Sequence, residues 1–179
     1  MTSGWVADVV RFWFALKPER WWRADESLDQ RIRQNFCKAW ADKRQLPVDA
    51  FVGGPLTALA AVILFDQFPR NMFRGAADQF ASDHLALAIA RDAVDRKLDD
   101  ELAPIERNFL YMPFQHSENL DDQNRAVLLQ SATGDENFAE AARKHRNVIE
   151  KFGRFPHRNA ILNRTPRPAE LAAGDVMPW

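Results

Sequence analysis

The sequence has 179 residues, 27% of them charged, and a formal net charge of -1. This length fits one domain over residues 1–179 that can bury a core without disulfides or a metal, and the single cysteine cannot form an intrachain bridge. The balanced charge excludes the basic surface typical of nucleic-acid-binding proteins. The amino terminus lacks a signal-peptide pattern, and the longest apolar run, residues 58–65, is far shorter than the ~20 residues that span a bilayer. We therefore expect a cytoplasmic protein with neither a nucleic-acid nor a membrane partner.

Apolar residues recur at spacings of three and four along almost the whole chain, which predicts an all-α protein. The first expected helix covers residues 5–16 and ends before Pro18. Its buried side comprises Trp5, Val9, Phe12, Trp13 and Leu16. A second helix, over residues 27–42, carries an apolar stripe at four-residue spacing: Leu28, Ile32, Phe36 and Trp40.

A third helix is expected to start at Pro55 and to run to about residue 68. It is apolar nearly all round, which is typical of a central helix. Further helices are expected over residues 83–97, 104–111, 117–132 and 136–152, with Ser82 or Asp83 capping the first of these and Ser117 capping the third. Short connections predict an antiparallel stack of about seven or more helices, and no sequence repeat recurs along the chain.

An aromatic-Pro-Arg-Asn pattern occurs twice, as "DQFPRN" over residues 66–71 and as "GRFPHRN" over residues 153–159. Proline disfavours a helical conformation in the preceding residue, so Phe68 and Phe155 are expected at helix breaks. Gly153 suits the left-handed position that closes a helix. Each cluster is then expected to begin a new helical turn that bears an arginine.

An arginine at a helix start needs a negative partner nearby, because the N-terminal end of a helix carries partial positive charge. A third polar cluster, "YMPFQHSENLDDQ" over residues 111–123, supplies histidine and carboxylates. We expect the three clusters to meet at one end of the helical stack. The candidate ligand-binding residues are Asp66, Arg70, Asn71, Arg154, Arg158 and Asn159, and the candidates for acid–base chemistry are His116, Glu118 and His157. The alternative is that these charges form structural ion pairs at chain ends.

Three long motifs in order, "ILFDQFPRNMFRG", "FLYMPFQHSE" and "FGRFPHRNAIL", resemble the signature of a widespread bacterial family of unknown function. The resemblance covers nearly the whole chain and implies a tetratricopeptide-repeat-like stack of helices, with no established reaction, cofactor or catalytic residue. The sequence departs from the family pattern after Leu162, where "NRTPRPAEL" replaces a Gly-Arg pair and a Ser/Thr-Pro-Glu-Glu helix start. Asn163 can adopt the left-handed turn that glycine would fill.

Two function classes are compatible with these features. The first is a binding module whose polar pocket near the clusters holds an acidic small molecule or peptide. The alternative is a small metabolic enzyme that uses the His/Glu/Arg cluster for acid–base chemistry on an anionic substrate. No metal motif, phosphate loop or dinucleotide-binding glycine pattern is present, so no cofactor is implied. A homo-oligomer is compatible with the sequence, and the pattern of residues specifies no reaction.

Overall fold

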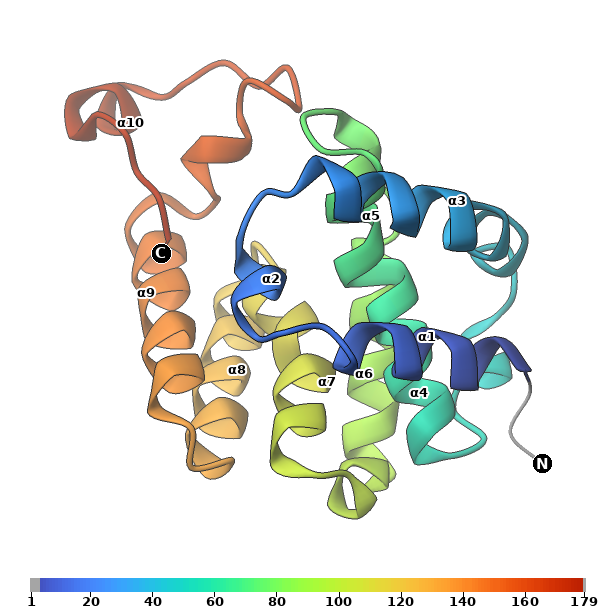
Figure 1. Cartoon of the computed structure of the whole chain (residues 1–179). Coiled ribbons are helices and arrows are strands. Elements are labelled where there is room, and N and C mark those ends of the chain that lie inside the picture. The colour runs from blue at the N-terminus through green and yellow to red at the C-terminus, as the bar shows by residue number, and fades with distance from the viewer. Residues whose placement is uncertain (1–3, 179) are drawn as a thin grey trace. The chain divides into compact units, whose positions relative to one another are not determined.

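The computed structural model describes residues 4–178, and its secondary structure is helical throughout (Figure 1). Helices account for 73% of the chain, and no strand occurs within the described range. The all-α prediction is therefore confirmed, whereas the tetratricopeptide-like arrangement stays a prediction. Among residues 4–178, no helix is both long enough and apolar enough to cross a membrane.

The described chain forms two compact units that divide after Leu110. The boundary falls within helix α7 (Pro104–His116). We call the part up to Leu110 the N-terminal unit and the part from Tyr111 the C-terminal unit. The assignment of one domain to the whole chain stays a prediction.

The N-terminal unit is built around helix α4 (Pro55–Val62), which packs against α1 and α6. Residues 58–65 are fully buried, as expected for a segment that is apolar on every side. Pro55 occupies the first turn of α4, as predicted. The other α-helices wholly within this unit are α1 (Gly4–Phe14), α2 (Glu19–Trp22), α3 (Glu26–Lys43), α5 (Phe68–Met72) and α6 (Asp83–Asp95).

The predicted break at Phe68 is wrong, because the chain continues from α4 through a π-helical turn (Ile63–Gln67) directly into α5. Widening the helix by one residue accommodates Pro69, whose ring would clash with a carbonyl of the preceding turn. Proline also lacks an N–H, so the backbone carbonyl of Phe65 needs another donor. Ser82 Oγ supplies it at 2.6 Å, which explains why Ser82 stands at the N-cap position of α6 without capping that helix.

The apolar stripe predicted on α3 is confirmed, since Leu28, Ile32, Phe36 and Trp40 are all buried. On α1, Trp13 is buried as predicted. Phe12 and Leu16 of the same stripe are only half-buried. Their partial exposure marks a groove beside α1.

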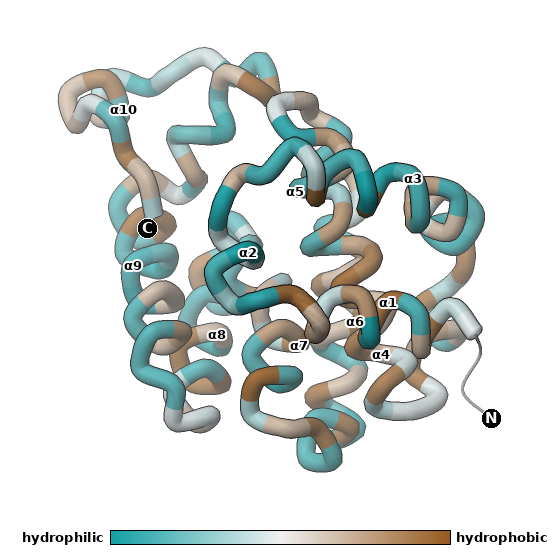
Figure 2. The backbone as a smooth tube through the Cα atoms, viewed as in Figure 1, coloured by the Kyte–Doolittle hydropathy of each residue, from teal (hydrophilic) through white to brown (hydrophobic). Residues whose placement is uncertain are grey.

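The C-terminal unit contains α8 (Leu120–Ala132) and α9 (Glu136–Phe152), which pack side by side as an antiparallel pair (Figure 1). Hydrophobic residues recur among hydrophilic ones along α9 (Figure 2). They form one buried face of the helix, which includes Phe138, Ala142 and Ile149. A short 3-10 helix (Pro156–Arg158) and α10 (Pro168–Ala173) follow.

Two predicted boundaries in this unit are wrong. Helix α7 was expected to end at Tyr111 but continues through Pro113 to His116. The flanking residues Tyr111, Met112 and Phe114 are buried, and packing of such residues outweighs the loss of one helical hydrogen bond at proline.

Helix α8 begins at Leu120 rather than at Ser117, because Asn119 is its N-cap. The Asn119 Oδ1 atom accepts the backbone N–H of Asp121 at 2.8 Å and that of Asp122 at 3.3 Å. Ser117 instead donates its hydroxyl to Asp122, at 2.6 Å.

Candidate functional site

In the first cluster, Arg70 is held between two carboxylates of the N-terminal unit. Its guanidinium donates to both oxygens of Asp83, at 2.8 and 2.9 Å, and lies 3.3 Å from the Asp66 carboxylate. It also donates to the backbone carbonyl of Asp66 at 2.5 Å. Burial alone would lower the pKa of Arg70, but the charges of Asp66 and Asp83 raise it above its ordinary value. Arg70 therefore has the negative partner that the sequence predicts for an arginine in this segment.

Asn71, the other candidate in this segment, contributes to a second polar contact between α5 and α3. Its amide donates to Asp29 Oδ1 at 2.7 Å. Arg74 donates to both oxygens of the same carboxylate, at 2.7 and 2.9 Å. Asp29 and Asn71 are buried, so this contact joins two helices of the unit.

In the C-terminal unit, the Glu118 carboxylate is enclosed by Arg164 and Phe155. Arg164 donates to both Glu118 oxygens, at 2.7 and 3.0 Å, and to the Phe155 carbonyl at 2.9 Å. The Phe155 backbone N–H donates to Glu118 at 2.7 Å. Burial would raise the pKa of Glu118, but the hydrogen bonds from Arg164 and Phe155 lower it.

Arg154 and Asn159 both bind Glu170, the third residue of α10. Arg154 donates to the two Glu170 oxygens at 2.6 and 2.8 Å, and Asn159 donates to one of them at 2.9 Å. The Arg154 hydrogen bonds are the main reason that the pKa of Glu170 falls to about 2. These contacts attach α10 to the segment that follows α9.

The second and third clusters meet within the C-terminal unit, as predicted. Arg158 is buried, donates to the backbone carbonyl of His116 at 3.0 Å and stacks over the Phe155 ring, 4.6 Å from its centroid. The first cluster belongs to the N-terminal unit, so the expectation that all three clusters converge stays a prediction.

Two histidines near these clusters, His145 and His157, are neutral at pH 7. His145 lies between the rings of His116 and Phe155, with centroid separations of 6.2 and 5.7 Å, and its Nδ1 is 2.8 Å from the Ala141 carbonyl. Burial, reinforced by His116 and Arg158, lowers the pKa of His145 to about 3. Burial and the adjacent Arg158 lower the pKa of His157 to about 4. Two uncharged, weakly basic imidazoles therefore pack in this unit.

Acid should destabilise the protein through His145, because its pKa is lower in the folded chain than in the unfolded chain. As the pH falls below 6.5, the unfolded state binds the proton first, and stability is lost down to the folded pKa of about 3. We expect His145 alone to lower the free energy of unfolding by on the order of 2 kcal/mol between pH 7.5 and pH 5. Urea denaturation at both pH values measures this change.

The matched variant is His145→Gln, which should lose that part of the pH dependence. Glu118 and Glu170 lose their contributions only below about pH 4.5, outside this range. Identical pH dependence in the variant and the natural protein would contradict the assignment.

Four partners of the predicted site residues were not themselves predicted: Asp29, Asp83, Arg164 and Glu170. Glu170 had a recognisable signal, since Pro168 opens α10 and Glu170 two positions later accepts the Arg167 backbone N–H at 2.7 Å. Asn163, in the segment that departs from the family pattern, adopts the expected left-handed turn with φ of 52°. Asp29 and Asp83 had no such signal.

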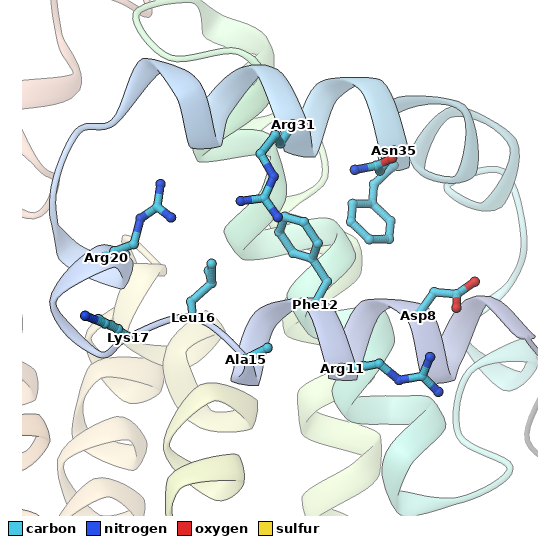
Figure 3. A pocket seen from close by; sticks show the side chains of 10 residues that line it. Asp8, Arg11, Phe12, Ala15, Leu16, Lys17, Arg20, Arg31 and Asn35 are labelled. Carbon is cyan, nitrogen blue, oxygen red and sulfur yellow. The ribbon is translucent and has the colours of Figure 1, made fainter.

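A groove of about 840 Å³ opens between α1 and α3, beside α2 (Figure 3). Its lining comprises Asp8, Arg11, Phe12, Ala15, Leu16, Lys17, Arg20, Arg31, Asn35 and Phe36. Every one of these residues belongs to the N-terminal unit. The volume lies in the range of small-molecule sites, but the lining is more polar than is usual for such sites, with five charged side chains, one amide and four apolar residues.

The charge of this basic groove is strongly unbalanced, with four cationic side chains and one acid, Asp8. Arg20 is ion-paired with Asp25, which is not part of the lining. Arg31 stacks over Phe12, 5.3 Å from the ring centroid. Within the described part of the chain, no carboxylate pairs with Arg11, Lys17 or Arg31. Sequence reasoning missed this groove because its cations come from three helices and from the loop between α1 and α2. Among residues 4–178, no group of three or more histidine, cysteine or acidic side chains is placed to hold a metal.

Residues 9–173 match the family model described as a bacterial protein of unknown function, DUF924. The chain belongs to the DUF924 family. The resemblance inferred from the three motifs is thus confirmed, and the description of DUF924 assigns no activity.

One solved structure with the same fold is the protein of unknown function ATU0120 from Agrobacterium tumefaciens. It is 38% identical to this chain, with a TM-score of 0.88, and the match covers 97% of this chain and 98% of the other. No curated protein matches the sequence. The function must therefore be argued from the site itself.

Proposed function

We propose that this DUF924 protein is a binding module for a small anionic ligand, and that the ligand occupies the basic groove between α1 and α3. The observation that carries the proposal is the contrast between two sets of arginines. Arg70, Arg154 and Arg164 are each bonded to both oxygens of a carboxylate. The groove instead gathers cations with one acid around a space of small-molecule size.

Arg31 is the best-prepared anion ligand of the groove. Stacking on the Phe12 ring restrains its guanidinium, so less conformational entropy is lost when it binds. A stacked guanidinium keeps its N–H edge available for two parallel hydrogen bonds to a carboxylate or phosphate. Figure 3 shows Arg31 reaching from α3 into the groove toward Phe12 of α1.

The arginine clusters at residues 66–71 and 153–159 are then structural clamps in this proposal. Their side chains hold α5 to α6 and α10 to the segment after α9. Glu118 is engaged by Arg164 and Phe155, and burial keeps His157 neutral and weakly basic. We propose no reaction at His116, Glu118 or His157.

The test is a thermal-shift measurement with pyrophosphate and citrate. A ligand at 100 times its Kd stabilises the folded state by about 2.7 kcal/mol, which corresponds to a rise in Tm of roughly 5 °C or more for a chain of this size. We expect the natural protein to show such a saturable rise with at least one of these anions. Arg31→Gln should reduce it strongly.

The matched control is Arg44→Gln, because Arg44 also stacks on an aromatic ring, with its guanidinium 4.2 Å from the Trp40 centroid. Arg44 is exposed and is not part of the groove lining. An equal loss in both variants would indicate a general charge effect and contradict the site. The absence of any saturable shift would contradict the proposed function.

A further inference from the structure

We infer that the ligand of the basic groove is an organic phosphate monoester, with its phosphate bound by Arg31 and its organic part against Phe12 and Leu16. This inference rests on the proposed function and specifies its ligand class. It depends on three properties of the groove: the number of unmatched charges, the types of cation and the volume.

The number of unmatched charges favours a dianion. The lining has four cations and one acid, and Asp25 neutralises Arg20 from outside the lining. Arg11, Lys17 and Arg31 then share the single acid Asp8, so the lining has two more positive than negative charges once Arg20 is paired. A phosphate monoester carries a charge of about -1.5 to -2 at pH 7, whereas a monocarboxylate or sulfate ester carries one negative charge. A dianion matches the groove more closely.

The types of cation favour phosphate among the dianions. Arg31 offers a planar guanidinium that can bind two oxygens of one phosphate. Lys17 lies apart from Arg31 (Figure 3) and adds positive charge to the same groove without sharing that contact. Arg20, Lys17 and Leu16 lie toward one end of the groove, and Asp8 and Asn35 lie toward the other (Figure 3). Arg11 lies at the Asp8 end and Arg20 is paired with Asp25, so the unmatched positive charge of Lys17 and Arg31 lies away from Asp8, as expected for a ligand with one doubly charged group.

The volume and the apolar lining favour an ester over inorganic phosphate. The groove has about 840 Å³, far more than a free phosphate ion fills. From Asp8 to Phe12 it follows α1 for four residues, or roughly 6 Å at the rise of an α-helix, and the lining continues to Ala15 and Leu16 just after the helix ends. Phe12, Leu16 and Phe36 provide apolar surface along this length, which suits an organic part attached to the phosphate.

The experiment compares phenyl phosphate with phenyl sulfate by isothermal titration calorimetry at pH 7.5. The two esters have the same shape, but only the phosphate is a dianion. We expect phenyl phosphate to bind at least 10-fold more tightly. Lowering the pH to 5.5 should weaken phenyl phosphate several-fold, because its second pKa is about 6, and should leave phenyl sulfate unchanged.

Two further ligands separate the contribution of the double negative charge from that of the organic part. Malonate, a dicarboxylate, tests whether two negative charges suffice, and we expect it to bind at least 10-fold more weakly than phenyl phosphate. Inorganic phosphate lacks the organic part and should also bind more weakly. Arg31→Lys keeps the charge but removes the guanidinium, so it should reduce the affinity for phenyl phosphate about 10-fold, whereas Arg44→Lys should not.

The outcomes distinguish this inference from the function on which it rests. Equal affinity for phenyl phosphate and phenyl sulfate, or for phenyl phosphate and malonate, would overturn the phosphate assignment and leave anion binding intact. Inorganic phosphate binding as tightly as phenyl phosphate would overturn the ester assignment. If none of these anions bound, nor pyrophosphate or citrate, the proposed function would fail as well.

Discussion

Replacing Arg70 with alanine is expected to lower the free energy of unfolding by about 3–5 kcal/mol. The Asp66 side chain is fully buried, and Arg70 is the cation that lies 3.3 Å from its carboxylate. The substitution leaves that buried charge without its guanidinium and also removes the two hydrogen bonds to Asp83. A substitution that removes the partner of a buried charge is among the most destabilising single substitutions. Urea denaturation measures the change.

Two comparisons identify the cause of this loss. Arg44→Ala removes an exposed arginine elsewhere in the same unit and should change stability by about 0.5 kcal/mol or less. The double variant Asp66→Asn/Arg70→Met removes the buried charge together with its partner, and it should be more stable than Arg70→Ala. If Arg70→Ala lowered the free energy of unfolding by less than about 1 kcal/mol, Arg70 would not be needed to stabilise the buried Asp66 carboxylate.

Replacing Arg164 with methionine is expected to destabilise the protein by about 2–3 kcal/mol. This side chain makes two hydrogen bonds to Glu118 and one each to the Phe155 carbonyl and to Asn159 Oδ1. Arg164 and Glu118 are 22% and 27% exposed, so solvent screens part of their attraction and the expected loss is smaller than for Arg70. Methionine retains much of the apolar stem and isolates the effect of the lost guanidinium.

The control in the same unit is Arg143→Met, which removes the ion pair between Arg143 and the exposed Glu136 and should cost less than 1 kcal/mol. The double variant Glu118→Gln/Arg164→Met tests the ion pair directly. If Arg164→Met and Arg143→Met were equally stable, the enclosure of Glu118 would have no structural role.

The two repeated motifs thus place arginines in similar structural roles. In "DQFPRN" the arginine is held by Asp66 and Asp83, and in "GRFPHRN" Arg154 is held by Glu170. The Arg70–Asp83 and Arg154–Glu170 bonds each join separate helical segments, whereas Arg70 and Asp66 lie four residues apart in one continuous helix. An arginine-rich motif therefore need not mark a binding site when the chain supplies the carboxylates.

The amino-acid sequence by itself determined the helical class and much of the core. Apolar residues three and four positions apart fall on one face of a helix, because a helical turn has about 3.6 residues. This pattern therefore predicts a helix regardless of where the segment lies in the fold. The stripe on α3 and the fully apolar α4 were correct for this reason. Gly153, with φ of 69°, was also predictable, since few other residues tolerate a left-handed conformation at a helix end.

Only the tertiary structure decided what happens at the prolines. Local preference predicts a break at Phe68 and a helix end before Pro113, yet both segments remain helical. Burial of the surrounding residues and remote donors such as Ser82 Oγ, which binds the Phe65 carbonyl, offset the missing proline N–H. These partners lie 17 residues apart in the chain, beyond the reach of local preference.

Tertiary structure also decided which arginines are bound within the protein and which line the groove. The sequence places Arg70 beside Asp66, but the bonds to Asp83 depend on how the connection before α6 folds back. The basic groove combines Arg11 of α1 with Lys17, Arg20 and Arg31, which contribute from other segments. Charge pairing depends on distances of a few ångströms between separate helices, and sequence spacing fixes such distances only within a single helix.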